Sequence, residues 1–370
     1  MFKNNVDTSI KDLALPPAEH GIVILLDPPS YHYHNNRFFD LNTPLNRDQT
    51  LKPNLKLKQT LERAGYPVFT ADLFHGLQNV YGNCEFHYWG FGSPAARALK
   101  LSGRGLKKMG VVLFEPPLIK PRDYKHIPKL LASFDNVFLH NTIGDGYSLP
   151  PNDSGRKLKK FYWTNRKYPS ACVNSNQKKR LSKIALIAGA HFTKAKYENG
   201  YGKRLEAVKK FTFEGSLDLF GFGWNRIQLR SPFISAYWYL RLVLARVVVT
   251  QPSKKSDVYR NYDFSLCFEN MAMSGYITEK IFDSLFSRCI PIYWGAPDIK
   301  EYIPENCFID LNDFKNIEEC VAYCNNLNSE EKEIYRIEID RFLESDNFKK
   351  FKNGIHGFLS DFYLADRNQR

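Results

Sequence analysis

Residues 262–310 read YDFSLCFENMAMSGYITEKIFDSLFSRCIPIYWGAPDIKEYIPENCFID, and this stretch decides the fold. In its first seven residues, Tyr262–Phe268, large apolar or aromatic side chains alternate with smaller or polar ones, as in a buried strand. Residues 275–277 form a turn, Thr278 opens a helix, and residues 290–295 make the next strand. A strand, a helix and a second strand in this order predict a parallel sheet covered by helices.

Four polar residues fall at the carboxyl end of the first strand and at the helix start: Asn270, Tyr276, Glu279 and Lys280. Open parallel sheets bind ligands there, because strand ends leave a crevice and helix amino ends point unpaired N–H groups at anions. A nucleotide diphosphate would suit such a site. Thr278 is a candidate N-cap, and a stripe of apolar residues at helical spacing should seat the helix on the sheet. The stripe consists of Ile281, Phe282, Leu285 and Phe286.

A solvated helix opening is the alternative for Thr278, Glu279 and Lys280, because this triplet is common in soluble proteins. The helix dipole favours a carboxylate in the first turn and disfavours an ammonium group, so Lys280 is mildly unfavourable there unless an anion compensates it. The neighbouring runs Phe268–Asn270 and Pro291–Pro297 favour the binding site over the solvated helix.

The composition is that of a globular chain with a basic balance. Its 370 residues are 43% apolar, which is enough to bury a sizeable core in two domains or one large one. The formal net charge of +13 points to anionic partners and carries no information on fold. A sugar nucleotide, an anionic membrane surface and nucleic acid are the candidates. Nucleic acid is disfavoured, because the sequence shows no arginine-rich helix, recognition motif or zinc spacing.

The seven cysteines show neither a Cys-x-x-Cys pair nor a zinc-ligand spacing with histidine. An odd number of thiols, several in expected core strands, is typical of reduced cysteines in a cytoplasmic enzyme. Residues 1–16 are polar without an apolar signal core, so we expect neither a secretory peptide nor an amino-terminal anchor. The aromatic and aliphatic segment 232–250 is interrupted by Arg241 and Arg246, and we do not expect it to span a membrane. It is either a helix packed within or between domains or an interfacial helix at a lipid surface.

Strands and helices alternate along the chain. In the first half, a helix over residues 51–64 ends at Gly65, a good C-terminal cap. Residues 168–183 are hydrophilic and lack a core-like period, which places a linker there. The expected strands are residues 21–26, 67–69, 109–114 and 136–140 before the linker, and 184–187 and 217–220 after it. Terminal helices are expected over residues 328–343 and 354–364.

The long run Tyr262–Gly295 resembles the signature of glycosyltransferase family 10, the alpha-1,3/1,4-fucosyltransferases. Three parts carry the resemblance: Phe268-Glu269-Asn270, the segment 275–283 (GYITEKIFD), and the segment 291–295 (PIYWG). The resemblance continues more weakly through residues 302–304 and 308–310, so strong similarity covers about fifty residues.

Membership of this family implies two Rossmann-like doubly wound domains that face a cleft, the GT-B type, with helices at the carboxyl terminus. It implies an acceptor-binding domain over residues 1–165, a GDP-sugar donor-binding domain over 166–345, and a helix over 346–370 that packs back toward the first domain. The activity implied is hexosyl transfer, with fucose moving from GDP-fucose to a glycan and inversion at the anomeric centre. A soluble bacterial type fits best, located in the cytoplasm or peripherally on the inner membrane face.

Glycosyl transfer needs a base for the acceptor hydroxyl and positive charge for the departing diphosphate. Glu115 follows the buried run 111–114 and precedes two prolines, and its position resembles that of the family's catalytic glutamate. We expect Glu115 to be the base. The alternative is a strand-end carboxylate that faces solvent or accepts N–H groups of a turn. The next candidates for the base are Glu85, His87, His32 and His34.

Lys280 is the first candidate for neutralising the diphosphate, and Arg204 is the second. Arg204 lies at the start of an expected helix over residues 203–211 and corresponds to a phosphate-contacting arginine of the relatives. An exposed arginine on a basic helix is the alternative.

The other polar residues of the run complete the predicted donor site. Glu279 suits the ribose hydroxyls, and Asn270 and Tyr276 suit the diphosphate or the sugar. Glu269 is expected to be structural, bonding backbone N–H groups of the loop. No Asp-x-Asp occurs in the sequence, so we expect no metal site and no required cofactor, with a divalent ion at most stimulating product release.

The acceptor is expected to be a glycan with galactose or N-acetylglucosamine, such as a surface or lipopolysaccharide glycan, bound near residues 30–42. Peripheral contact with an anionic membrane is a further expected interaction. Three rival functions stand beside this one: a transferase for another GDP-sugar, a degenerate relative that binds glycans without turnover, and a basic nucleic-acid-binding protein.

Overall fold

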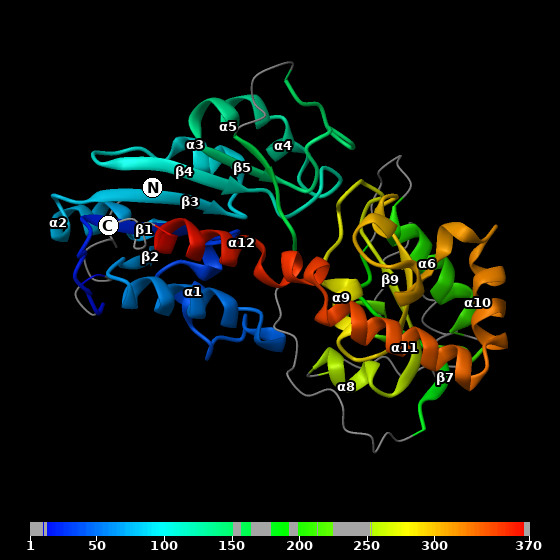
Figure 1. Ribbon diagram of the computed structural model, residues 1–370. Coiled ribbons are helices and arrows are strands. Elements are labelled where there is room, and N and C mark those ends of the chain that lie inside the picture. Colours follow the sequence, from blue (N-terminus) through cyan, green and yellow to red (C-terminus); the bar gives the residue numbers. More distant parts are fainter. Residues whose placement is uncertain are drawn as a thin grey trace. The chain divides into compact units, whose positions relative to one another are not determined.

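The computed structural model describes residues 10, 13–150, 157–163, 179–191, 199–212, 214–224, 252 and 254–365. The chain divides into two compact units. The first unit comprises Met1–Arg166 and Asn353–Arg370, and the second comprises Lys167–Lys352. Each unit is built on its own parallel sheet (Figure 1). The interfacial or packed helix considered for residues 232–250 lies outside the described residues, as does most of the expected linker.

The sheet of the first unit has the strand order β2-β1-β3-β4-β5-β6, and every described pair is parallel. The order reverses between β1 and β3, which makes the carboxyl ends of these two strands a topological switch point. The strands are β1 Ile22–Asp27, β2 Val68–Thr70, β3 Glu85–Phe91, β4 Leu106–Val112, β5 Asn136–Leu139 and β6 Leu158–Lys160.

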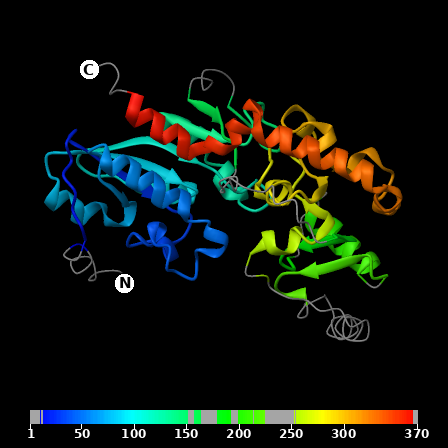
Figure 2. The same ribbon diagram turned by 60° about the horizontal axis from the view of Figure 1, so that its bottom comes forward.

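Helices cover both faces of this sheet. They are α1 Lys52–Arg63, α2 Phe74–Val80, α3 Ala95–Lys100, α4 Pro121–Tyr124, α5 Ile127–Ser133 and the second half of α12 Asp346–Leu364. Helix α12 is interrupted at Gly354, whose φ of 46° is left-handed, and its second half runs beside the sheet (Figure 2). There Ile355, Leu359 and Tyr363 share one apolar core with α1 and with β1, β3 and β4.

The sheet of the second unit repeats the same topology. Its order is β11-β10-β9-β7-β8, again parallel in every described pair, so the switch point lies between β7 and β9. The strands are β7 Leu181–Ile187, β8 Leu217–Phe220, β9 Tyr262–Phe268, β10 Ile290–Trp294 and β11 Ile309–Asp310. Residue partners such as Leu266 and Ile292 fix the register of the two central strands.

Among the described residues, the helices of this unit are α6 Gly200–Phe211, α8 Lys255–Tyr259, α9 Glu279–Leu285, α10 Ile317–Asn326, α11 Ser329–Glu344 and the first half of α12. Helices α6 and α10 share one apolar core with β8, β9 and β10. The predicted stripe on α9 is buried as expected, and its ring Phe282 lies 4.7 Å from the ring of Phe351. Short 3-10 helices lie at 31–33, 37–39, 47–49, 71–73, 299–301, 305–307 and 311–313.

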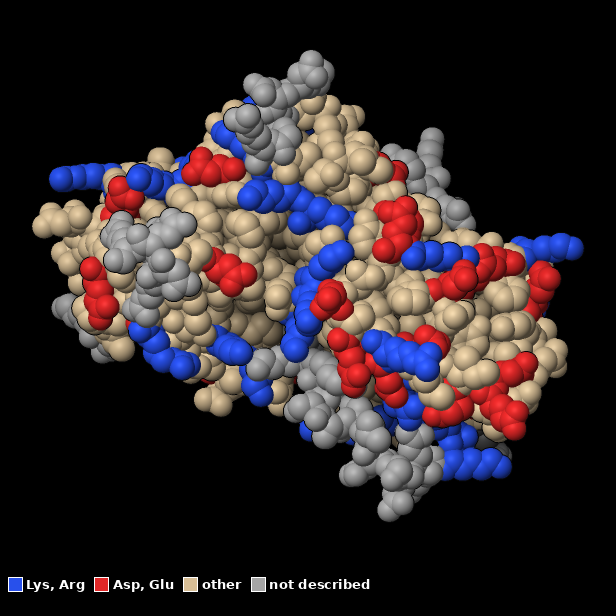
Figure 3. All heavy atoms as spheres, viewed as in Figure 1, with Lys and Arg blue, Asp and Glu red and all other residues tan. Residues whose placement is uncertain are grey.

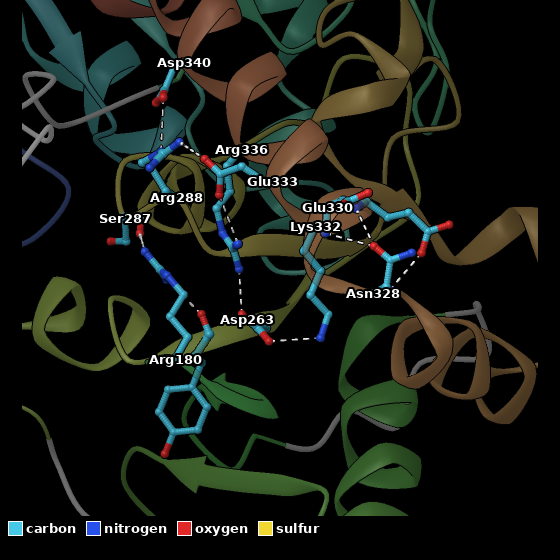
Figure 4. A network of polar contacts seen from close by, with 12 residues as sticks. Arg180, Asp263, Ser287, Arg288, Asn328, Glu330, Lys332, Glu333, Arg336 and Asp340 are labelled. Atoms are coloured by element: carbon cyan, nitrogen blue, oxygen red, sulfur yellow. Dashed lines mark hydrogen bonds and ion pairs between the residues drawn. The ribbon is translucent and has the colours of Figure 1, made fainter. Parts of the chain in front are cut away.

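A buried network of ion pairs and hydrogen bonds lies at the amino edge of the second sheet (Figure 4). Asp263, near the start of β9, accepts from Lys332 at 3.1 Å and from Arg336 at 2.6 Å, both on α11. Arg180 donates to the carbonyls of Tyr259, Tyr262 and Ser287 nearby. Two cations therefore compensate one buried carboxylate, which ties α11 to the strand that also leads to the opposite, carboxyl edge.

The two parallel α/β units predicted from the sequence are confirmed, although strand β3, the short strands β6 and β11, and several helices, among them α10, were not predicted. Strand β3 shows no period of two in its sequence, because nearly all of its residues are buried on both faces of the sheet. None of the helices in the described part of the chain is both long enough and apolar enough to cross a bilayer.

Candidate functional site

The switch point of the second unit brings the predicted donor residues together. Helix α6 follows β7, and Arg204 on that helix reaches the chain that leaves β9 at Phe268–Asn270. Lys280, at the start of α9, reaches back to Glu269 at the same strand end. The carboxyl edge of the sheet thus gathers side chains from two helices and one loop, in the place where such sheets bind ligands.

Glu269 is the centre of this arrangement. Its side chain is fully buried, and one carboxylate oxygen, Oε1, accepts the backbone N–H of Thr278 at 2.7 Å. The other oxygen, Oε2, accepts the Thr278 hydroxyl at 2.8 Å and the Lys280 ammonium at 3.0 Å. The carboxylate therefore has the hydrogen bonds and the opposite charge that a buried anion requires. The expected structural role of Glu269 is correct, and the ion pair with Lys280 was not predicted.

Lys280 is held on two sides and remains partly open. Its ammonium donates to Glu269 and, at 2.9 Å, to the hydroxyl of Thr278. Burial opposes the charged form, but the carboxylates of Glu269 and Glu279 outweigh this effect and raise the pKa of Lys280. With 26% of the side chain exposed, an ammonium that has three N–H donors and two acceptors in the protein retains one donor for a ligand.

Arg204 is buried and bound to the loop after β9. Its Nη2 donates to the carbonyl of Phe268 and, at 3.0 Å, to Oδ1 of Asn270. Burial lowers the pKa of Arg204, and the carboxylate of Glu269 opposes this shift. The predicted place of Arg204 at a helix start is wrong, because α6 begins at Gly200 and puts the arginine one turn inside. The alternative of an exposed arginine is also excluded, since only 5% of the residue is exposed.

The start of α6 is joined directly to the loop after β9. Asn199 caps the helix by accepting the N–H of Gly202 at 3.1 Å, and it forms an isolated bridge with Met271. The N–H of Gly200 donates to the carbonyl of Asn270 at 3.2 Å. A Cβ atom at Gly200 would lie 1.7 Å from the carbonyl oxygen of Glu269, so only glycine permits this approach.

Glu279 and Tyr276 belong to the same cluster. Both groups act electrostatically on Arg204, and Glu279 acts on Lys280 as well. Tyr276 is fully buried, and its backbone N–H donates to Met273 at 3.0 Å. Thr278 occupies the predicted N-cap position of α9, but its hydroxyl donates to Glu269 and does not cap the helix.

Further features line the same edge beyond the predicted residues. Lys203 lies over the ring of Trp294, with Nζ 5.1 Å from the ring centre, and His191 meets the ring of Phe222 edge-on at 5.3 Å. A cavity of about 260 Å³ opens between α6 and the chain after β11, and Lys203, Glu206 and Asn312 are among its lining residues. Sequence reasoning missed these features, although the pair Asn199-Gly200 before an apolar helical period was a usable sign of a helix start.

Glu115 lies in the first unit, in a bend three residues beyond the end of β4. It is half-buried, and its backbone carbonyl accepts the hydroxyl of Tyr124 at 3.0 Å. Next to it in sequence, Phe114 stacks on Trp163 with ring centres 5.5 Å apart and an interplanar angle of 28°. The carboxylate thus follows a strand of the sheet at its carboxyl edge, beside half-buried aromatic rings.

The four alternative candidates for the base occupy two different places in the first unit. Glu85 begins β3, at the amino edge of the parallel sheet, and forms an ion pair with Lys107 at 2.7 Å that lowers the pKa of this carboxyl. His87, inside β3, is buried, and its Nδ1 lies 3.0 Å from the hydroxyl of Tyr363. Both groups are far along the strand from the edge where ligands of such sheets bind. His32 and His34 do follow β1 at the carboxyl edge.

Charge and potential metal ligands complete the description. On the face shown in Figure 3, acidic side chains lie among the basic ones over the second unit. Within the described ranges, histidine, cysteine, aspartate and glutamate side chains form no group of three or more that could hold a metal ion.

Parts of the sequence, and the fold, are similar to those of known proteins. Residues 193–337 match the model of the glycosyltransferase family 10 (fucosyltransferase) C-terminal domain. The alpha-(1,3)-fucosyltransferase FucT of Helicobacter pylori is 45% identical over 69 residues, which are 19% of this chain and 14% of that protein. GDP-fucose protein O-fucosyltransferase 3 of Xenopus tropicalis is 32% identical over 90 residues, 23% of this chain and 19% of that protein. The chain therefore aligns with less than a fifth of either relative's length.

A solved glycosyltransferase from Rickettsia africae ESF-5 is similar in fold. It superposes with a TM-score of 0.56 at 12% identity, covering 93% of this chain and 98% of that one. At this level of identity the likeness concerns the fold alone, and it extends over both units.

Proposed function

We propose, from the match of residues 193–337 to the model of glycosyltransferase family 10 (fucosyltransferase), that the chain is a glycosyltransferase that moves fucose from GDP-fucose to a hydroxyl group of a glycan. Two of the relatives that it matches are named for fucosyl transfer, one of them with GDP-fucose as the donor. The proposal extends that donor to this chain.

One observation carries the proposal: Arg204, Asn270, Glu279 and Lys280 meet at the switch point of the second sheet. Lys280 keeps a donor for an anion, and we assign the binding of the ribose hydroxyls to Glu279, whose charge acts on Lys280. A nucleoside diphosphate presents both kinds of group, ribose hydroxyls and phosphate oxygens. The site therefore suits the leaving group of the reaction, which is GDP.

The reaction then takes a defined course. The base, which we assign to Glu115, removes the proton of the acceptor hydroxyl, and the oxygen attacks the anomeric carbon. The bond between that carbon and the β-phosphate oxygen breaks, its electron pair leaves with GDP, and attack opposite the leaving group inverts the anomeric centre. The charge that develops on the diphosphate is met by Lys280 and by Arg204.

The acceptor and the metal requirement are parts of the same proposal. We propose a glycan with galactose or N-acetylglucosamine, of the kind found in surface and lipopolysaccharide glycans. The sequence has no Asp-x-Asp, and the cations near the strand end supply positive charge, so the proposed reaction requires no protein-bound metal.

A donor screen tests the proposal. The nucleoside diphosphate released from GDP-fucose, GDP-mannose and UDP-galactose is measured with a panel of acceptors that contain galactose or N-acetylglucosamine. The expected result is acceptor-dependent release of GDP from GDP-fucose alone. Release from another GDP-sugar would replace fucose in the proposal. Binding of GDP without release from any donor would point to the degenerate relative, and absence of GDP binding would refute the function.

A further inference from the structure

We propose that Glu269 is the positioning residue that aims Lys280 at the diphosphate of the donor, an inference that rests on the proposed function. The carboxylate and the hydroxyl of Thr278 together hold the ammonium from two sides, 3.0 and 2.9 Å away. A lysine has four rotatable bonds and loses much rotamer freedom when it is fixed, so an unheld ammonium would rarely point one way. With Glu269 in place, the third N–H has a defined direction.

The position of Glu269 is itself restrained by the backbone around it. Its backbone N–H donates to the carbonyl of Trp294 at 2.8 Å, which joins it to the end of β10. Its Cβ and Cγ atoms pack so closely on Gly295 that a Cβ there would come within 2.8 and 2.6 Å of them. On the other side its carbonyl touches Gly200. Backbone from β10 and from α6 therefore encloses Glu269, and its carboxylate has one available orientation.

The charged groups that act most strongly on Lys280 come from three elements around it. They are Glu269 at the end of β9, Glu279 on α9 and Arg204 on α6. The first two favour the ammonium and the third opposes it. Without the charge of Glu269, only Glu279 among these groups favours the ammonium form of Lys280, while burial and Arg204 disfavour it. The ammonium would therefore lose its proton at a lower pH than in the parent chain.

The test is the substitution Glu269→Gln in the full chain, which keeps the shape and removes the charge. The matched control is Asp263→Asn, six positions earlier at the other end of β9. That carboxylate is also buried and also paired with lysine, Lys332, but it lies at the amino edge. Both variants and the parent are labelled with ¹³C at lysine Cε. The titration of Lys280 is followed by NMR after assignment with Lys280→Arg, and the affinity for GDP is measured by calorimetry at about pH 6.5 and 10.5, below and near the midpoint of an ordinary lysine.

For Glu269→Gln, we expect the titration midpoint of Lys280 to fall by about one pH unit or more, the usual effect of one close opposite charge. Because the pKa of Lys280 in the parent lies above its ordinary value, the ratio of variant to parent affinity for GDP should be about threefold or more worse at pH 10.5 than at pH 6.5, where Lys280 is charged in both. Asp263→Asn should lower the melting temperature and leave both quantities unchanged. A purely structural Glu269 would weaken GDP binding by the same factor at both pH values.

The outcomes separate the two proposals. An unmoved Lys280 titration, or a pH-independent loss of affinity, overturns the role of Glu269 even if the parent binds GDP. If the parent binds no GDP while the titration of Lys280 moves as expected, the proposed function fails, and control of the lysine charge by Glu269 is supported.

Discussion

Replacement of Gly200 by alanine tests the idea that the start of α6 must touch the loop after β9. The added Cβ would lie 1.7 Å from the carbonyl oxygen of Glu269, which is backbone and cannot rotate away. To reach even 3.0 Å, the helix start and the loop must separate by about 1.3 Å. That movement lengthens the bond from the Gly200 N–H to the carbonyl of Asn270, and it draws Arg204 away from the side chain of Asn270.

The expected cost combines two terms. Overpacking against a rigid neighbour costs about 1–3 kcal/mol, and the weakened backbone hydrogen bond adds about 1 kcal/mol. For a unit of this size, the sum corresponds to a decrease in melting temperature of roughly 5–15 °C. Because a displacement of about 1 Å in a positioning group lowers turnover by about 100-fold, the loss of transferase activity should exceed the loss of folded protein at 25 °C.

Gly202, two residues further along α6, provides the matched control. Among the described residues, a Cβ atom there would meet Oδ1 of Asn199 at 3.9 Å, an ordinary contact, so Gly202→Ala should gain helix propensity, about 0.5–1 kcal/mol, without a clash. Thermal unfolding and GDP calorimetry of both variants give the comparison. If Gly200→Ala melts at or above the temperature of the parent and binds GDP normally, the contact between α6 and the loop does not constrain the site, and the reasoning fails.

Three further predictions concern the base, the metal requirement and the terminal helix. Glu115→Gln should lower turnover by about 100-fold or more while GDP affinity stays unchanged, and normal turnover would place the base elsewhere. Dialysis against a chelator should leave transferase activity intact, whereas its loss and return with one stoichiometric ion would contradict a metal-independent reaction. Burial lowers the pKa of His356 to about 4, below its unfolded value, so stability should decrease as the pH falls from 6.5 toward 4. His356→Gln should flatten this pH dependence in thermal melts, and an unchanged slope would assign it to other groups.

Much of the fold could be predicted because its signals are local. The alternation of Tyr262–Phe268 and the apolar runs that became β1, β4 and β7 are properties of single segments. Strand β3 was not predicted, because Glu85–Phe91 is buried on both faces over most of its length and its sequence does not alternate between apolar and polar residues. Helix α10 was missed because its apolar positions include Cys320 and Cys324, which were considered only as thiols.

The sequence was sufficient to predict which residues lie at the site, but not which of them contact one another. Sequence position places Asn270, Glu279 and Lys280 near one strand end, and the structure confirms this neighbourhood. The ion pair of Lys280 with Glu269 spans eleven positions and depends on the angle at which α9 leaves its turn, which no sequence period encodes. For the same reason the burial of Arg204 was missed, because it depends on where α6 begins relative to the loop after β9.

The ion pair between Glu269 and Lys280 also weakens the inference that a lysine at a helix start indicates an anionic ligand. An ammonium in the first turn of a helix needs a compensating anion, and the structure supplies that anion internally, as Glu269. Lys280→Met alone would leave a buried carboxylate without its partner and destabilise the fold by about 3–5 kcal/mol, so lost binding in that variant would be ambiguous. The double variant Glu269→Gln with Lys280→Met removes both charges, and neutral replacements of a buried pair usually cost little. It should therefore melt near the parent temperature and still fail to bind GDP; a double variant that binds GDP as the parent does would show that Lys280 serves the fold and not the nucleotide.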